Sequence, residues 1–514
     1  MFSKVKSCAV HGVDGRMIDV EADVNDGLPV FTMVGYLSSS VRESSERVLT
    51  ALKNSVFHLP PKRITINLSP ADMRKDGSGY DLAIATAVLL SLGVTAELPM
   101  EQTLVLGELS LDGSIKAIPG VLPMVICARE EGMTSCIVPK ENVQEAALVQ
   151  GISVIGVSSL KETMEYIQGI KEYENTNVEQ PAVDTSEYLY DIDFSDVVGQ
   201  ESIKRGMEIA AAGFHNVLLT GAAGAGKSML AKRLPTILPQ MSFEESLEVT
   251  KIYSVGGMLP PEGGLIHRRP FRAPHHTISE YALIGGGRVP TPGEVSFAHY
   301  GVLFLDELPE FSKPVLEVLR QPLEDRRIRI SRVQASYEFP ADFMFVAAMN
   351  PCPCGNYPDY RRCSCTEQQI RRYQSKVSGP LLDRIDIRME VKGVKQEVLF
   401  SKQKTESSKT IRARVEQARQ MQKDRFAGTG LLFNSQLDGK NLEEYITLSE
   451  EGKRLVLQLF EEQELSVRGV HRVLKLARTI ADLAGSEEIE NAHLQEAAFY
   501  RNQDVFAKEV LYGN

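Results

Sequence analysis

Tryptophan is absent from this chain of 514 residues, and no apolar run approaches the roughly 18 residues that a membrane-crossing helix needs. The residues after Met1 do not form the apolar core of a secretory signal, which indicates a cytoplasmic protein with no membrane association. Cysteine is scarce, and the scattered Cys8, Cys127 and Cys136 are expected to be small buried side chains. The formal net charge of −11 excludes a general basic coat for nucleic acid, so such binding would need a local basic patch.

The order of apolar and polar stretches predicts three parts and one linker. These are an alternation of strands and helices over residues 1–170, a polar and acidic linker over 171–190, a nucleotide-binding part over 191–395, and a mostly helical part over 396–514. Strands are predicted at residues 63–68 and 103–108, and helices at 80–92 and 465–484, the last with Ser466 as its N-cap. The stretch 401–408 is expected to be loosely structured.

A glycine-rich motif is the most specific feature of the chain. It follows the apolar run 217–220, precedes a helix-like segment, and consists of Gly221, Ala222, Ala223, Gly224, Ala225, Gly226, Lys227 and Ser228. Glycines allow backbone N–H groups to close around phosphates, Lys227 neutralises the outer phosphates, and Ser228 offers its hydroxyl to Mg²⁺. The motif predicts nucleotide binding; a glycine-rich turn without a ligand would leave the Lys-Ser pair unexplained.

Two further apolar strands end in polar residues that suit ATP hydrolysis. The run 301–305 leads into Asp306, expected to hold Mg²⁺ directly or through water, and Glu307, expected to orient and deprotonate the attacking water. The run 343–349 leads into Asn350, whose amide can hold that water or sense the terminal phosphate. An ordinary acidic turn and a turn asparagine before proline are the alternatives.

Longer motifs carry a resemblance to a known family. The run 196–200, the phosphate loop, Leu-Asp-Glu307, Asn350 and the run 381–386 resemble an AAA+ ATPase of the branch that holds magnesium-chelatase subunits and replicative MCM helicases. Three runs resemble the ComM/YifB family of bacterial magnesium-chelatase-like proteins: residues 269–277 (RPFRAPHHT), 301–311 (GVLFLDELPEF) and 350–355 (NPCPCG). The resemblance covers essentially the whole chain.

This resemblance implies an α/β fold class. Its parts would be an N-terminal Lon-like (S5 domain 2-like) α+β domain, a central AAA+ P-loop NTPase α/β domain and a C-terminal helical lid. It also implies ATP and Mg²⁺ as cofactors, with ATP bound between neighbouring subunits of a homo-hexamer.

The same resemblance implies roles for two arginines. Arg384 would reach the neighbour's site as an arginine finger and offset the charge that develops on the transferring phosphate. A surface ion pair with Asp383 or Asp386 is the alternative. Arg468 matches the second sensor of the lid, with Arg472 one helical turn further on as the second candidate; solvated surface charges are the alternative for both.

The stretch from Arg326 to Phe339 alternates basic and apolar residues and predicts a β-hairpin between the Leu-Asp-Glu307 strand and the Asn350 strand. In this AAA+ branch a hairpin inserted there points into the pore of the ring. Arg329 and Arg332 would then hold DNA phosphates, with an ordinary solvated hairpin as the alternative.

Four cysteines lie within fourteen residues. Their pattern is C-x-C, eight residues, C-x-C: Cys352, Cys354, Cys363 and Cys365. Four thiolates can close a tetrahedral Zn²⁺ site, and a reducing cytosol disfavours disulfides. Reduced thiols in a structured loop are the alternative.

The N-terminal part resembles Lon proteases in residues 74–83 and 107–113, yet its catalytic dyad is missing. On that pattern the nucleophile position is Gly79, with Ser78 one residue early, and the lysine position falls on Leu122, with Lys116 several residues away. A Ser–Lys dyad needs a lysine within hydrogen-bond reach. We therefore expect a Lon-like fold without proteolysis, which disfavours an ATP-dependent protease.

The function expected from the resemblance is an ATP-driven hexameric motor on single-stranded or branched DNA. Its activity would be that of a helicase for branch migration, in recombination during natural transformation, with recombination proteins as partners. The alternative is a magnesium-chelatase-type AAA+ remodeller that acts on a partner protein.

Overall fold

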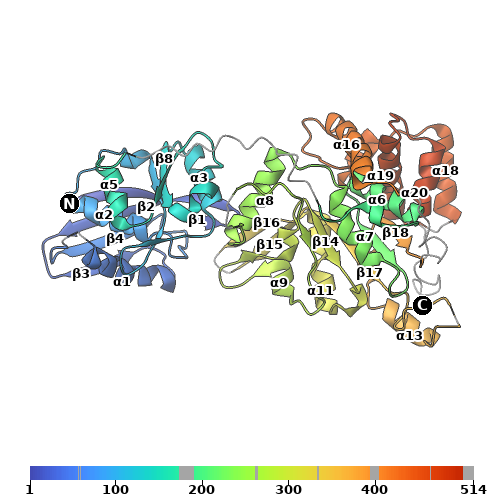
Figure 1. The fold of residues 1–514 in the computed structure, drawn as a ribbon, viewed down its shortest axis with the longest axis horizontal. Coiled ribbons are helices and arrows are strands. Elements are labelled where there is room, and N and C mark those ends of the chain that lie inside the picture. Colours follow the sequence, from blue (N-terminus) through green and yellow to red (C-terminus); the bar gives the residue numbers. More distant parts are fainter. Residues whose placement is uncertain are drawn as a thin grey trace.

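The computed structural model describes residues 1–55, 57, 59–172, 190–260, 264–332, 335–359, 361–393, 405–462 and 465–501. Figure 1 shows the N-terminal part at one end of the long axis, a central sheet with its helices, and the C-terminal helices at the other end. Most of the predicted linker, 171–190, and half of the predicted loose stretch, 401–408, lie outside the described residues.

The N-terminal part is a seven-stranded mixed sheet with helices packed on it. The strand order is β3-β4-β2-β1-β5-β8-β9. The strands are β1 (Phe2–His11), β2 (Asp14–Asn25), β3 (Val30–Val34), β4 (Arg63–Ser69), β5 (Thr103–Val105), β8 (Ser135–Pro139) and β9 (Ser153–Val157). The longer helices are α1 (Ser39–Asn54), α2 (Asp81–Ser91), α3 (Val121–Glu130) and α5 (Leu160–Ile167). Strand β4 and the nearly fully buried α2 confirm the predictions at 63–68 and 80–92.

The strand predicted at 103–108 was only half right. It stops at Val105, and Glu108–Leu109 (β6) instead pairs with Ile115–Lys116 (β7) in a separate small hairpin. The chain leaves the sheet at Gly107, whose N–H donates to the carbonyl of Gly79 at 3.0 Å. The apolar run 103–108 therefore spans the end of β5 and the start of β6, because hydrophobic periodicity does not indicate where the backbone turns.

The central part is built on an all-parallel five-stranded sheet. Its order is β11-β14-β17-β10-β18, for β11 (Phe271–Arg272), β14 (Val302–Leu305), β17 (Met344–Met349), β10 (Val217–Thr220) and β18 (Ile387–Glu390). Strands β10, β14 and β17 are buried along their whole length, as their continuous apolar runs predict for a sheet covered on both faces. Strand β17 lies between β10 and β14, so the residues after all three meet at one edge of the sheet.

Helices flank this sheet and continue into the C-terminal part. Those of the central part include α6 (Glu201–Gly213), α7 (Lys227–Arg233), α8 (Phe243–Val255), α11 (Lys313–Val318), α12 (Arg320–Asp325) and α13 (Glu367–Gln374). Those of the C-terminal part are α16 (Ser408–Arg425), α17 (Gly439–Tyr445), α18 (Glu450–Glu462), α19 (Val467–Leu483) and α20 (Asn491–Arg501). Apolar residues of α6, α16, α19 and α20 form one continuous core with one face of the sheet, so the C-terminal helices share the core of the central part.

Local capping accounts for the predicted helix 465–484. The structure begins α19 at Val467, and the Ser466 hydroxyl accepts a hydrogen bond from the N–H of Gly469 at 3.1 Å. This confirms both the helix and its N-cap. None of the helices in the described part of the chain has the length and apolar character that a bilayer-spanning segment requires.

The N-terminal part packs on α8 and on the predicted hairpin. The hairpin forms from β15 (Arg327–Ser331) and β16 (Ser336–Pro340), as predicted. The ring of His11 stacks on Tyr337 at 4.5 Å between centroids, and Lys251 Nζ lies 3.0 Å from Asp14 Oδ1. The hairpin therefore contacts the N-terminal part directly.

Candidate nucleotide site

The phosphate loop has the backbone that its glycines predict. It leaves β10 at Gly221 and enters α7 at Lys227, and both Gly224 and Gly226 have positive φ angles, of 77° and 96°. A Cβ added to Gly221 would lie 2.2 Å from the carbonyl oxygen of Val391. Packing against the end of β18 therefore requires glycine at 221, and the backbone conformation favours glycine at 224 and 226.

Lys227 is buried and connects the loop to Asn350. Its Nζ lies 2.7 Å from the Gly221 carbonyl oxygen, 2.9 Å from that of Ala222 and 3.0 Å from Asn350 Oδ1. Burial lowers the pKa of Lys227, while the carboxylates of Asp306 and Glu307 oppose this shift. A buried ammonium held by neutral oxygens is suited to an anionic ligand, which would supply the missing counter-charge.

The residues expected to hold Mg²⁺ already touch each other. Ser228 Oγ lies 2.5 Å from Asp306 Oδ2, although 78 residues separate them in sequence. The N–H of Glu307 donates to the other oxygen of Asp306 at 3.0 Å. A hydroxyl and a carboxylate fit the oxygen ligands that Mg²⁺ prefers beside nucleotide phosphates.

Glu307 and Asn350 complete the same cavity. Glu307 has a φ of 53°, a backbone region that few residues other than glycine adopt, and this turns the chain sharply at the end of β14. Its exposed side chain, the phosphate loop from Ala223 to Ser228, Asp306 and Asn350 line a cavity of about 300 Å³. The structure thus brings together groups predicted from three separate stretches of sequence.

Arg384 and Arg468 line a second cavity of about 240 Å³. Arg384 pairs with Glu324 and donates to the carbonyl of Pro380 at 2.8 Å. Arg468 is exposed, and its side chain has no hydrogen bond or ion pair to another described residue. Within the described residues, neither arginine lines the phosphate-loop cavity of its own chain.

Arg472, the second candidate for the sensor, is committed to another contact. It pairs with Asp386, whose side chain also accepts a hydrogen bond from the N–H of Asn216 at 3.1 Å. Burial alone would raise the pKa of Asp386, but Arg472 and His215 hold it well below its usual range. Sequence analysis did not indicate that pairing with Asp386 distinguishes Arg472 from Arg468.

The hairpin arginines are partly neutralised. Arg327 and Arg329 lie 2.8 and 3.1 Å from the carboxylate of Glu338 on the opposite strand, and Arg332 donates to the carbonyl of Gly287 at 3.0 Å. Arg329 remains 58% exposed. Residues 333–334, at the predicted tip, lie outside the described residues.

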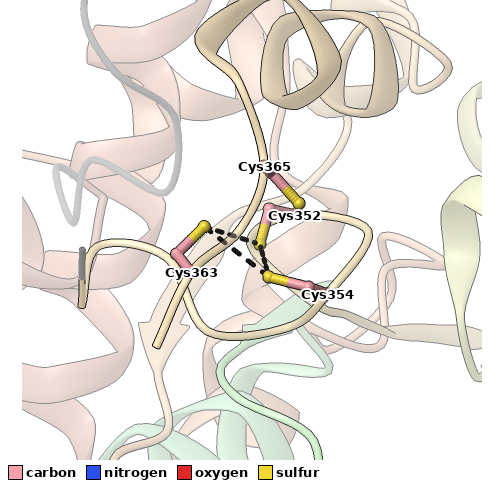
Figure 2. Close-up of side chains that lie close together, drawn as sticks. All are labelled: Cys352, Cys354, Cys363 and Cys365. Carbon is pink, nitrogen blue, oxygen red and sulfur yellow. Dashed lines mark hydrogen bonds between the residues drawn. The ribbon is translucent and has the colours of Figure 1, made fainter. Parts of the chain in front are cut away.

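The four cysteines come from two separate C-x-C pairs, and their side chains lie close together (Figure 2). The Sγ atom of Cys352 lies 3.4 Å from that of Cys354 and 3.8 Å from that of Cys363, and Cys354 and Cys363 are 3.6 Å apart. The sulfur atoms of all four, Cys365 included, lie within 4.8 Å of one another. A tetrahedral zinc site with Zn–S bonds of about 2.3 Å has S···S edges of about 3.8 Å, so the residues present fit Zn²⁺.

The Lon-like catalytic positions are filled by apolar packing. A Cβ on Gly79 would lie 3.1 Å from Ile118 Cδ1, and Leu122 is fully buried, with its N–H donating to Glu145 at 2.8 Å. The hydroxyl of Ser78 bonds to Glu108. Among the described residues, Ser78 therefore has a carboxylate as its partner where a Ser–Lys dyad would need a lysine.

Comparison with known proteins accounts for most of the chain. Three family models match it: "Subunit ChlI of Mg-chelatase" over residues 20–142, "Magnesium chelatase, subunit ChlI" over 193–399, and "Magnesium chelatase, subunit ChlI C-terminal" over 405–501. The Competence protein ComM of Haemophilus influenzae is 40% identical over 503 residues, which cover 97% of each chain. The Uncharacterized protein YifB of Escherichia coli is 40% identical over 506 residues, 98% of this chain and 97% of its own length.

The chain belongs to the ComM/YifB family of magnesium-chelatase-like AAA+ ATPases. Its N-terminal part also has Lon similarity: Lon protease 2 of Bacillus subtilis is 30% identical over 183 residues, 32% of each chain. The resemblance and the fold class predicted from sequence are thereby confirmed. ATP and Mg²⁺ are the cofactors that this ComM/YifB membership implies.

Proposed function

We propose that the chain is the subunit of a cytoplasmic, ATP-driven homo-hexameric motor that moves along single-stranded or branched DNA. The observation that carries the proposal is the division of the hydrolytic residues between two cavities of one chain. One cavity has the phosphate loop, Asp306, Glu307 and Asn350; the other has Arg384 and Arg468. A complete site would then need two subunits.

In the first cavity the roles follow from contacts. Lys227 would exchange the carbonyls of Gly221 and Ala222 for phosphate oxygens, while Asn350, already at 3.0 Å, keeps its ammonium oriented. Ser228 and Asp306 would hold Mg²⁺, which offsets phosphate charge when bound. Glu307, exposed to the cavity, would orient the attacking water and accept its proton.

The second cavity would act on the neighbouring subunit. Arg384 would leave its exposed partner Glu324 to stabilise the transferring phosphate. Arg468 lines the same cavity, and its side chain has no competing ion pair among the described residues. Arg472 would keep Asp386 as its structural partner. We therefore propose Arg468 for the second-sensor role.

DNA is proposed as the substrate from two observations. The basic hairpin carries Arg329 and Arg332 in a chain whose overall charge is acidic, and the relative from Haemophilus influenzae is named a competence protein. Branch migration in recombination during natural transformation, with recombination proteins as partners, is the activity that this combination favours. The Lon-like part would be non-proteolytic, and one Zn²⁺ ion would occupy the four cysteines.

A second candidate is a remodeller of a partner protein, as the magnesium-chelatase family models suggest. The pairing of Arg327 and Arg329 with Glu338 favours it, because it removes basic charge from the hairpin. The two candidates differ in their response to DNA.

The test is the ATPase rate with and without single-stranded and branched DNA, for the wild type, Lys227→Ala and Glu307→Gln. Strong stimulation of the wild type, lost in both variants, would support the DNA motor. An ATPase that ignores DNA over the whole concentration range would refute it and favour the remodeller.

A further inference from the structure

The loop that carries the cysteines starts in the nucleotide site. Strand β17 ends at Met349, Asn350 contacts Lys227, and Cys352 follows two residues later. Between them, the carbonyl of Pro351 accepts a hydrogen bond from the side chain of Gln374, at 2.9 Å, and Gln374 is only 2% exposed. Cys352 is therefore held close to Asn350, the residue that contacts Lys227.

The turn after the first cysteine pair lies beside the phosphate loop. Gly355 has a φ of 79°, and a Cβ placed on it would lie 3.4 Å from the backbone nitrogen of Ala223 and 3.9 Å from Cγ of Asn350. In Figure 2 the green chain that passes below Cys354 belongs to this earlier part of the sequence. The turn thus lies within one side-chain carbon of both the backbone that would hold phosphates and the side chain that would sense them.

The second cysteine pair ties the same turn to a helix. Cys365 directly precedes Thr366, whose hydroxyl caps α13 by accepting from the N–H of Gln369. Helix α13 buries Ile370, Tyr373 and Gln374, so its position is fixed by packing. Bonds from one ion to Cys352, Cys354, Cys363 and Cys365 would close the loop between β17 and α13.

We infer that the four-cysteine site is a positioning element of the nucleotide site: a Zn²⁺ ion bound there holds the Gly355 turn against Ala223 and Asn350. The inference rests on the proposed nucleotide site. The sulfur atoms are 3.4–3.8 Å apart for three pairs, close to the edges of a zinc–thiolate tetrahedron. Without the ion, the segment between β17 and α13 is no longer cross-linked, and the Gly355 turn is no longer held beside the phosphate loop.

The first arm of the test measures zinc and nucleotide separately, on the full chain without DNA. Purified wild type should contain one zinc per chain, and Co²⁺ substitution should give thiolate charge-transfer absorption. Cys363→Ser should lose both, and its dissociation constant for a fluorescent ATP analogue should rise about tenfold. The half-buried Cys127→Ser, in the N-terminal part, is the matched control and should match the wild type in both measurements.

The second arm strains the turn beside the phosphate loop and keeps the metal. Gly355→Ala forces a side chain into a left-handed turn beside Ala223, so it should retain zinc but bind the ATP analogue about tenfold more weakly. Gly428→Ala is its control, because Gly428 has a φ of 77° and nothing within 4 Å of the added Cβ. Lys227→Ala should no longer bind nucleotide but should keep zinc. This result distinguishes a wrong assignment of the nucleotide site from a missing link between the zinc site and the nucleotide site.

Three results would overturn the inference. One is a wild type that binds neither Zn²⁺ nor Co²⁺. Another is a zinc-free Cys363→Ser protein that remains folded and binds the analogue as tightly as the wild type. The third is a zinc-loaded Gly355→Ala protein that binds the analogue as tightly as the wild type.

Discussion

Replacing Arg384 with alanine should abolish ATP hydrolysis and leave folding almost unchanged. The side chain of Arg384 is 12% exposed and that of its partner Glu324 is 58% exposed, so the substitution removes some packing as well as a half-exposed ion pair. We expect a cost of about 1–2 kcal/mol and a fall in melting temperature of about 4 °C or less. As an arginine finger, the same side chain would lower the barrier by about 4–7 kcal/mol, a factor of about 10³–10⁵ in rate. The two magnitudes are far enough apart to be separated by experiment.

The assay mixes two inactive proteins. Arg384→Ala has an intact phosphate loop, and Lys227→Ala has an intact Arg384. If subunits exchange at random in an equimolar mixture, about a quarter of the interfaces combine an intact loop with an intact finger, so about a quarter of the wild-type rate should return.

A mixture no more active than its two components would refute the assignment of Arg384 to a neighbour's site. A large loss of thermal stability in Arg384→Ala would instead make it a structural residue. The control is a mixture of the wild type with the double variant Lys227→Ala/Arg384→Ala. Its rate should be about half that of the wild type without subunit exchange and about a quarter with it.

Three other substitutions test separate contacts. Glu307→Gln should bind nucleotide normally and slow single-turnover hydrolysis about 100-fold or more; an unchanged rate would remove Glu307 as the base. Gly221→Ala places a Cβ 2.2 Å from the Val391 carbonyl and should weaken nucleotide binding about tenfold or more, so wild-type affinity would contradict the packing argument. Asp386→Asn leaves Arg472 unpaired and should cost about 3 kcal/mol at pH 7. Because the pKa of Asp386 is depressed in the folded state, its contribution is present above its unfolded pKa of about 3.9 and declines as the pH falls below that value. The difference in melting temperature between wild type and Asp386→Asn should therefore shrink below about pH 4, and a difference that grows there would contradict the sign.

The strands and helices that sequence analysis placed correctly are marked by short, contiguous signals. The phosphate loop needs glycines at fixed positions between a strand and a helix, and Ser466 caps the helix that begins beside it. The buried strands before Asp306 and Asn350 are continuous apolar runs. Parallel strands deliver their following residues to one edge, so the meeting of these groups was predictable from the fold class.

What the sequence left open depends on pairing between distant residues. Arg468 and Arg472 are equivalent in the helical pattern, and only the position of Asp386, in another element, distinguishes them. The partial neutralisation of Arg329 depends on the hairpin register that places it opposite Glu338. The contact between the Gly355 turn and Ala223 joins segments more than a hundred residues apart, and no local pattern reports it.

The most direct test of the central claim is to follow a fluorescently labelled branched joint molecule with the wild type and with Glu307→Gln, in the presence of ATP and Mg²⁺. A DNA motor should move the branch to completion only with the wild type and only with ATP, while Glu307→Gln should bind the junction and leave it in place. Vigorous ATP hydrolysis by the wild type with no movement of the branch would contradict the account.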